Sequence, residues 1–194
     1  MQIHKLTGAG LESALRDLAQ LRIEVFRDFP YLYDGTLAYE EGYMAGLAGA
    51  RDAIVAAAEE DGRIVGCATG SALAGHHEEF AAPFAAHDYD PAQVFNCGES
   101  VLLPAYRGRG LGHKFFDFRE AHARERGYQY SSFCAVIRPS DRPLRPANYV
   151  PLDAFWEKRG YRKVPGMVAS FRWKDIDRAQ ESEHPMQFWL RELA

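Results

Sequence analysis

The chain has few cysteines and no long apolar run. Cys67, Cys97 and Cys134 are its only cysteines, and their odd number and wide spacing do not fit a zinc site. Buried, reduced thiols in a cytoplasmic protein are the simplest interpretation. No stretch approaches the ~20 apolar residues that a membrane helix needs, and the N-terminus lacks the apolar segment of a secretion signal. We therefore expect a cytoplasmic protein without a membrane partner.

Positive charge is also scarce. Against 27 Asp and Glu residues stand only 23 Lys and Arg residues, which gives a formal net charge of −4. Such a chain has no overall field that would attract nucleic acid, and it shows no basic stripe outside residues 107–114. Repeats, low-complexity segments and linkers are lacking too, so we expect a single domain over residues 1–194. Any anion binding must be local.

Apolar periodicity predicts an α+β fold. It places strands at 2–6, on both sides of Asp61-Gly62, at 94–103, at 128–137 and at 167–173, and helices at 11–26, 37–47, 111–126 and 152–159. A strand, a helix and a strand over 94–137 form a crossover unit, which implies one parallel pair in an otherwise antiparallel sheet. Residues 74–93 are expected to form a long excursion with about one helical turn, and the C-terminal "HPMQFWLREL" a packed tail.

The stretch "YRGRGLGHKFFDF" (106–118) combines bare backbone with positive charge where a helix is expected to begin. Its glycines and basic residues are Arg107, Gly108, Arg109, Gly110, Gly112 and Lys114. Unpaired N–H groups at a helix start can hold a phosphate or pyrophosphate when no side chains block the approach. The dinucleotide loop and the nucleotide P-loop both need a glycine where His113 stands. Simple helix capping, or anion binding for some other chemistry, are alternatives.

The motif that matches is R-x-x-G-x-G, Arg107 to Gly112, after a strand that ends in "LLP". In this motif, and in the order of elements from Ile54 to Trp173 including "FWEKRGY", the sequence resembles the GNAT family of acyl-coenzyme A-dependent N-acetyltransferases. The resemblance implies a twisted mixed sheet, mostly antiparallel with one splayed parallel pair, flanked by helices on both sides. It also implies direct transfer of an acetyl group from acetyl-CoA to the amine of a small molecule or peptide.

The resemblance further implies which residues bind the cofactor. The backbone of the loop would hold the pyrophosphate, and the main chain of Leu102 and Leu103 would pair with the pantetheine amides. The loop residues are Arg107, Gly108, Arg109, Gly110, Leu111 and Gly112. Asn148 resembles the family's cofactor-binding asparagine, although its spacing to Gly160 is one residue long and a turn after Pro146 is the alternative.

Amine acylation needs a base for the amine and a proton for the departing thiolate. Glu99 is the candidate base because it lies in the strand that faces the reaction point; a salt-bridged charge is the alternative. Many family members carry a tyrosine four residues before the glycine of the "GF" or "GY" pair, and here Trp156 occupies that position. Since an indole is no general acid, we consider Tyr149 as the proton donor, and water or the thiol's own acidity otherwise.

The aromatic and acidic stretch "FPYLYDGTLAYEEGY" (29–43) is the expected acceptor wall. Phe29, Tyr31 and Tyr33 are its candidate substrate-binding residues, with core packing as the alternative. The carboxylates of Asp34, Glu40 and Glu41 would favour a cationic amine unless they are merely solvated.

Other possibilities are weaker. Cys134 could form an acyl-enzyme with His113 or His122, although a strand cysteine is more often a small apolar filler. We expect no metal site, since the adjacent residues of "HHEE" (76–79) point in different directions. The apolar residues 188–190 would allow a homodimer. Because the tyrosine is missing at 156, the alternative function is a non-catalytic coenzyme A-binding or sensing module.

Overall fold

The computed structural model describes residues 1–75 and 78–193. Its strands are β1 (Gln2–Leu6), β2 (Ile54–Glu60), β3 (Arg63–Ala72), β4 (Val94–Leu102), β5 (Tyr130–Val136), β6 (Arg162–Trp173) and β7 (Ser182–Glu192). Its helices are α1 (Gly8–Phe26), α2 (Leu37–Ala48), α3 (Glu78–Ala85), α4 (Leu111–Glu125) and α5 (Asp153–Lys158), with short 3-10 turns at Leu73–Gly75, Pro91–Gln93 and Pro104–Tyr106.

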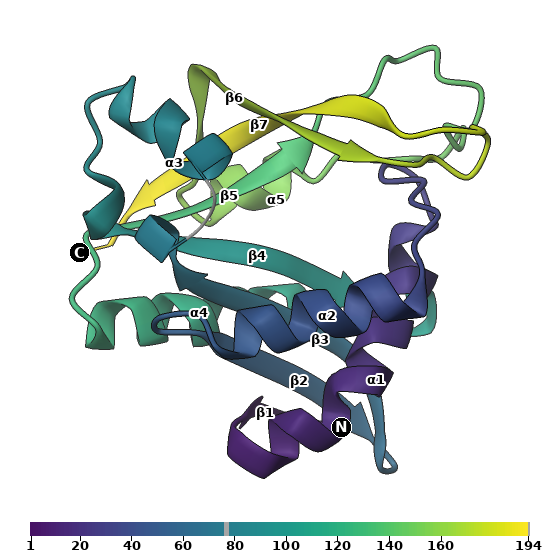
Figure 1. The fold of residues 1–194 in the computed structure, drawn as a ribbon, viewed down its shortest axis with the longest axis horizontal. Coiled ribbons are helices and arrows are strands. Elements are labelled where there is room, and N and C mark those ends of the chain that lie inside the picture. The colour runs from purple at the N-terminus through teal and green to yellow at the C-terminus, as the bar shows by residue number, and fades with distance from the viewer. Residues whose placement is uncertain (76–77, 194) are drawn as a thin grey trace.

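The strands form one mixed sheet in the order β1-β2-β3-β4-β5-β7-β6 (Figure 1). Within the described residues, β4 and β5 are the parallel neighbours and the other pairs are antiparallel. The helix α4 connects the parallel strands, because such a pair cannot be joined by a tight turn. The predicted fold class, a mostly antiparallel sheet with one parallel pair and helices on both sides, is confirmed.

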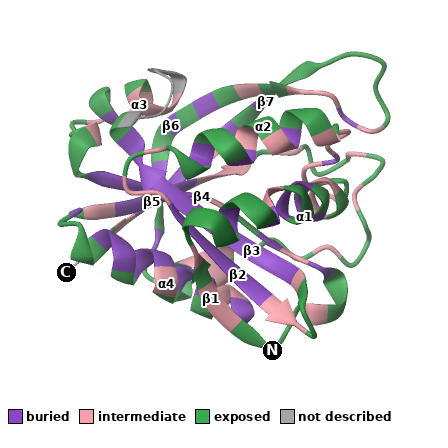
Figure 2. Cartoon of the chain, turned by 60° about the horizontal axis from the view of Figure 1, so that its bottom comes forward, coloured by how far each residue is buried: buried purple, intermediate pink, exposed green. Residues whose placement is uncertain are grey.

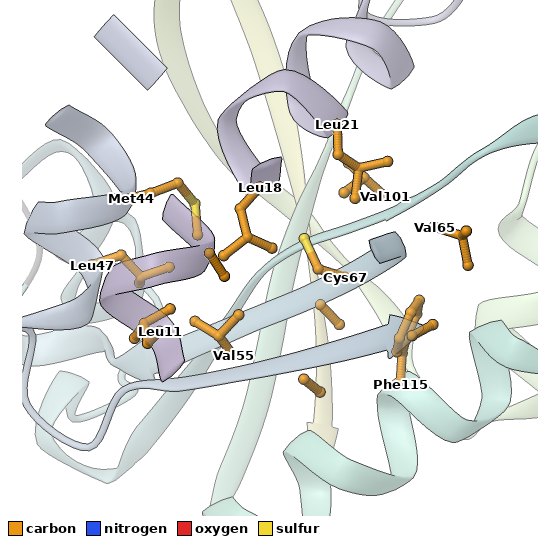
Figure 3. Close-up of a cluster of buried hydrophobic side chains, with 14 of the residues drawn as sticks. Leu11, Leu18, Leu21, Met44, Leu47, Val55, Val65, Cys67, Val101 and Phe115 are labelled. Atoms are coloured by element: carbon orange, nitrogen blue, oxygen red, sulfur yellow. The ribbon is translucent and has the colours of Figure 1, made fainter. Parts of the chain in front are cut away.

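Helices α1 and α2 cover one face of the sheet, and α4 and α5 cover the other (Figure 1). The apolar stripe of α1 faces the strands, and its residues Leu18 and Leu21 pack with Met44 of α2 and Val101 of β4 (Figure 3). Exposed residues lie mainly on the outer sides of the helices and in loops, while the central strands are largely buried (Figure 2). Helical periodicity of the sequence therefore translates directly into this layering.

A β-bulge between β3 and β4 changes which side chains face α1 and α2. The register shifts between Ala68 and Gly70, which pair with Ser100 and Cys97 respectively. Before the shift, Cys97 packs in the cluster on the α4 side; after it, Val101 packs in the cluster with α1 and α2. The strands β3 and β4 approach each other closely here, since a Cβ on Gly98 would lie 2.6 Å from Thr69 Oγ1. The bulge thus turns Glu99 toward α1 and α2.

The parallel pair separates soon after it begins. Strands β4 and β5 pair at three positions, Val94↔Tyr130, Phe95↔Ser131 and Asn96↔Ser132. Beyond Asn96 the two strands diverge, and β5 continues to pair only with β7. The splayed parallel pair implied by the family resemblance is therefore present, and it leaves a gap in the middle of the sheet.

Two expectations for the chain were wrong. Residues 74–93 contain α3, a two-turn helix that tolerates Pro83 within it, rather than about one turn. The C-terminal tail is strand β7, inserted between β5 and β6, so the strand over 167–173 is not the last one. Pro185 disguised this strand, but it stands opposite Ile137 just past the end of β5, where a missing N–H costs little. The tail's Phe188, Trp189 and Leu190 are buried in the sheet, which removes the surface on which a homodimer was expected.

Candidate functional site

A cleft of about 1320 Å³ opens where β4 and β5 separate. It exceeds the ~300–1,000 Å³ of typical small-molecule pockets, so it can hold a long cofactor together with a second substrate. Of the predicted site residues, those that line it are Phe29, Tyr31, Glu99, Leu102, Arg107, Gly108, Gly110, Leu111, Gly112, Asn148 and Tyr149. Leu103, Arg109 and Tyr33 are not among the lining residues.

The backbone at both edges of the gap points into it, and one of its groups, the Leu102 carbonyl, accepts from Arg107 Nε. Leu103 N–H donates to the Val65 carbonyl at 3.0 Å, and residues of an antiparallel ladder alternate in direction. Ser100 and Leu102 therefore turn their backbone groups away from β3, toward the gap. On β5, the Ile137 N–H donates to the Pro185 carbonyl of the β7 strand at 2.8 Å, so the backbone of Cys134 faces the gap from the other side. This arrangement suits an extended chain that contains amides.

The loop before α4 forms an open cradle of N–H groups. Gly108 and Gly110 have φ of 76° and 77°, a conformation that favours glycine, and nothing lies within 4 Å of a Cβ added at either. Helix α4 starts at Leu111 without a side-chain cap, and the N–H of Lys114 makes its first backbone bond, to the Gly110 carbonyl. The N–H groups of residues 111–113 consequently have no helical partner and present the positive helix end to an anion.

The two arginines of the motif make different contacts. Arg107 Nε donates to the Leu102 carbonyl at 3.2 Å, and its Nη2 lies 3.6 Å from Asp28 Oδ2. Arg109 is not among the residues that line the cleft, and its Nη2 donates to the Ala105 carbonyl at 3.0 Å. Arg107 therefore ties the loop to the strand end and to the α1–α2 connection, and Arg109 remains available at the surface.

Glu99 sits in a buried network on the α1 and α2 side of the cleft. Its side chain is 8% exposed and ion-paired with Arg22 of α1, and Arg22 also meets Glu40 of α2. Tyr43 OH donates to Glu99 Oε2 at 3.2 Å. The Glu99 carboxylate and burial raise the pKa of the Tyr43 phenol well above its usual value. The phenol therefore stays protonated, and Glu99 is held as an oriented carboxylate at the cleft wall.

Trp156 and Tyr149 lie at the opposite wall. The Trp156 indole packs against Trp189 and Phe133, with ring centres 5.1 and 4.9 Å apart, in the aromatic core beneath α5. Tyr149 instead meets the edge of the Phe29 ring at 4.6 Å, across the mouth of the cleft. Burial raises the pKa of Tyr149. Of these two lining residues, Tyr149 alone carries a hydroxyl that can donate a proton.

An arginine after β5 fixes the α1–α2 connection. Arg138 donates from Nε to the Pro30 carbonyl at 2.7 Å and from Nη2 to the Tyr31 carbonyl at 2.5 Å. Its guanidinium also makes a bidentate pair with Asp175, at 2.8 and 2.9 Å. Tyr31 is held further by the ring of Trp173, 6.1 Å away. These contacts hold the aromatic wall of the cleft in place.

Asp175, in the β6–β7 connection, is the centre of a cluster of polar side chains that we call the hub. The hub consists of Arg138, Arg142, Asp175 and His184. The residue is 2% exposed and pairs with Arg138 and with Arg142 Nη2 at 3.0 Å. His184 Nδ1 accepts from Arg138 Nη1 at 3.1 Å, because arginine has no acceptor. The hub joins the α1–α2 connection, the segment after β5 and the β6–β7 connection.

Sequence reasoning missed Arg22 and the hub. One signal for Arg22 was present: it follows Leu21 on the buried stripe of α1 and lies four residues after Leu18, where a lone charge needs a buried partner. The hub gave no local signal, because Arg138 and Asp175 stand in irregular segments far apart in sequence.

The acidic residues of the 29–43 stretch do not face the cleft. Glu40 is buried against Arg22. Asp34 pairs with Arg27 and Lys174, and Glu41 lies near Arg16. Tyr33 is oriented toward Glu40, and burial raises the pKa of its phenol. The charges that were expected to favour a cationic amine are thus neutralised elsewhere.

The cysteine alternative receives no support from the geometry. Cys134 lines the cleft, but burial raises the pKa of its thiol to about 12. His113 packs against Phe155, and His122 bonds the Asp52 carbonyl near the other end of α4. Neither imidazole is bonded to the thiol, so no pair resembles an activated nucleophile.

Within residues 1–75 and 78–193, no three His, Cys, Asp or Glu side chains come together as metal ligands. None of the helices in those ranges combines the length and apolar character needed to cross a bilayer. His76 and His77, which the sequence analysis discussed as metal ligands, lie outside the described residues.

Comparison with known proteins gives a family match. A model of the acetyltransferase (GNAT) family matches residues 15–147, more than half of the chain. A ribosomal-protein-alanine N-acetyltransferase from Brucella melitensis has 15% identity and a TM-score of 0.63, with 100% of both chains covered. An aminoglycoside 6'-N-acetyltransferase complexed with coenzyme A has 12% identity and a TM-score of 0.64, over 100% of this chain and 98% of that one. No curated protein sequence matches.

Proposed function

This chain belongs to the GNAT family of acetyltransferases, and we propose that it transfers an acetyl group directly from acetyl-CoA to the amine of a small molecule or peptide. The observation that carries the proposal is the continuity of the cleft. Free backbone in the β4–β5 gap leads to the open N–H cradle before α4. An unpaired strand edge and a phosphate cradle in one groove match the two chemical halves of coenzyme A, its amide-containing arm and its pyrophosphate.

The chain's own groups fit acetyl-CoA. The loop over 107–112 would bind the pyrophosphate through backbone N–H groups, with Arg107 and Arg109 adding positive charge. Leu102 would pair with the pantetheine through its backbone; the N–H of Leu103 is already used by β3, so only Leu102 would serve. Asn148, exposed on the cleft wall, would contact the same arm.

Glu99 would orient and deprotonate the amine, directly or through one water. Its carboxylate faces the α1 and α2 side, so the acceptor would enter from there, past Phe29 and Tyr31. The ion pair with Arg22 fixes the position of the carboxylate, which suits the ordering of a water beside the amine.

Two further groups would complete the reaction. The Ser100 N–H faces the gap beside the bulge and would stabilise the carbonyl oxygen of the acetyl group as it gains charge. Tyr149 would supply the proton to the departing thiolate, since Trp156 cannot.

The proposal is tested by two measurements on the purified protein. Calorimetric titration should give saturable binding of acetyl-CoA, and a panel of amines should show coenzyme A release that depends on both substrates. Binding without turnover of any amine would favour the alternative, a non-catalytic coenzyme A-binding module. Competition by ATP or NAD as strong as that by coenzyme A would instead indicate an unrelated anion binder, and the acetyltransferase proposal would fall.

A further inference from the structure

We infer that Arg145 is a recognition residue for a carboxylate on the acceptor, so that the favoured substrate is an amine that also carries a carboxylate. The inference rests on the proposed function, since it names the acceptor class of that same cleft.

The acidic lining residues are already neutralised. Asp28 lies 3.6 Å from Arg107, Glu99 pairs with Arg22, and Asp153 Oδ1 is 2.5 Å from Lys163 Nζ. A cationic acceptor would therefore find no unpaired carboxylate among the described lining residues. The cleft offers little to attract a second positive charge beside the reacting amine.

The basic lining residues are also engaged, except one. Arg107 and Lys163 have the carboxylate partners just named, and Arg138 is bidentate with Asp175. Arg119, 1% exposed, donates to the Glu99 carbonyl at 2.9 Å and to Ser100 Oγ at 2.8 Å. Arg145 remains: within residues 1–75 and 78–193 its guanidinium has no hydrogen bond and no ion pair.

Arg145 is nonetheless held in place. Its Cζ lies 4.8 Å from the centre of the Tyr149 ring and 5.6 Å from that of Phe29, and the two rings touch edge to face. The backbone N–H of Arg145 donates to the Arg142 carbonyl at 2.9 Å, which connects it to the hub. Stacked aromatic contacts restrain a guanidinium while its in-plane N–H donors stay free.

A half-buried guanidinium with free donors is suited to one kind of ligand group. Its planar fork matches a carboxylate with two parallel hydrogen bonds, and the partly apolar aromatic surroundings strengthen the pairing. Phe29 belongs to the connection through which we propose that the acceptor enters, so the anion would be on the acceptor. The phosphates of coenzyme A carry the other anionic chemistry that could reach this arginine, and the test must separate the two sources.

The first arm measures binding without turnover, in the presence of saturating coenzyme A. The probes are N-acetylglycine, N-acetylleucine and N-acetylphenylalanine, each compared with its carboxamide, in wild type and in Arg145→Gln. We expect the wild type to prefer at least one carboxylate over its amide roughly ten- to a hundredfold, as for a hydrogen-bonded charge pair. In Arg145→Gln the ratio should fall to about one, because the carboxylate loses affinity and the amide does not.

The second arm measures acetyl-CoA affinity in the same proteins, with Arg172→Gln as control. Arg172 lies on β6 and does not line the cleft. Its substitution by Gln therefore makes the same change in net charge as Arg145→Gln, but away from the cleft. We expect acetyl-CoA to bind all three proteins equally. Arg145→Lys, which keeps the charge without the planar fork, should show an intermediate carboxylate preference.

The results distinguish the possible failures. If no carboxylate binds better than its amide in the wild type, or if the preference survives in Arg145→Gln, the inference is wrong. If Arg145→Gln loses acetyl-CoA affinity instead, the arginine serves the cofactor phosphates and the inference is also wrong. If the wild type prefers carboxylates over their amides through Arg145 but turns over no amine, the proposed function is wrong and the assignment of Arg145 stands.

Discussion

The side of the cleft that we propose binds the cofactor is formed by the backbone of one contiguous stretch, 102–113, whereas the side that we propose for the acceptor is formed by side chains from several distant segments. The first presents open N–H groups and two glycines, Gly108 and Gly110, with open space around them. The second presents charges that are buried and paired, around Glu99 and around Asp175. Backbone chemistry is the same for every sequence, so the first side can bind a common cofactor. Side chains differ, so the second side can select an acceptor.

The two sides also differ in how much of the fold depends on them. An exposed loop that binds through its backbone can lose its ligand without affecting the core. A buried ion pair cannot lose one partner so easily, because the remaining charge stays desolvated. Substitutions on the cofactor side should therefore change binding and leave stability nearly unchanged, and those in the hub should change both.

The largest effect should come from Gly110→Asp. The new carboxylate fills the open space before α4 and repels a pyrophosphate there, so acetyl-CoA affinity should fall more than ~100-fold by calorimetry. The strain of a non-glycine residue at φ of 77° costs about 1 kcal/mol, and thermal unfolding should remain cooperative.

Gly62→Asp is the matched control. Gly62 has φ of 75° in the β2–β3 turn and open space around it, far from the cleft in sequence. It should show the same small loss of stability with unchanged affinity. Equal affinity of Gly110→Asp and wild type would mean that the loop does not bind the cofactor.

Asp175→Asn should cause the largest loss of stability. It leaves Arg138 and Arg142 without their shared buried carboxylate, and breaking a buried pair costs about 3–5 kcal/mol in the free energy of unfolding. Urea denaturation measures this loss. Asp177→Asn, at the exposed end of Arg142, should lower stability far less; equal losses would show that the hub is not the buried centre of this side.

Glu99→Gln should lower kcat/KM about 100-fold for any accepted amine, because the variant lacks the carboxylate that we propose as the base. Acetyl-CoA affinity should stay within about twofold, since Glu99 lies on the other side of the cleft from the loop. Tyr43→Phe removes only the hydrogen bond to Glu99 Oε2 and should have a smaller effect on kcat/KM. Full activity of Glu99→Gln would leave Glu99 as a structural charge.

The smallest effect should appear as a pH dependence of stability. Burial lowers the pKa of His184, which also faces the cation of Arg138 beside Asp175. The folded state thus resists a proton that the unfolded state accepts near pH 6.5, and stability should decrease as the pH falls below about 6.5. His184→Gln should reduce this slope in urea denaturation at several pH values.

Part of the slope should survive in that variant. Burial lowers the pKa of His122 in the same direction, on the α4 side of the sheet. A slope of unchanged size in His184→Gln would mean that His184 does not contribute.

Much of the fold could be predicted because its signals are local. Each of three features depends on residues that lie close together in the sequence: the hairpin at Asp61-Gly62, the apolar stripe of α1 and the loop before α4. The β7 strand could not be recognised, since Pro185 argues against a strand unless its position at the end of β5 is known. The site divides in the same way: the loop follows from a local sequence pattern, and the hub and Arg145 do not.

The sequence by itself determined the crossover around α4, the glycine loop and the order of elements up to β6 apart from α3, because these follow from periodicity and from the backbone freedom of glycine. Only the tertiary structure decided which way Glu99 faces, because the bulge opposite Thr69 inverts the alternation of β4. It also decided that Arg138 meets the Pro30 carbonyl, 108 residues away in sequence. Contacts of this kind depend on packing across the whole sheet, which no local pattern records.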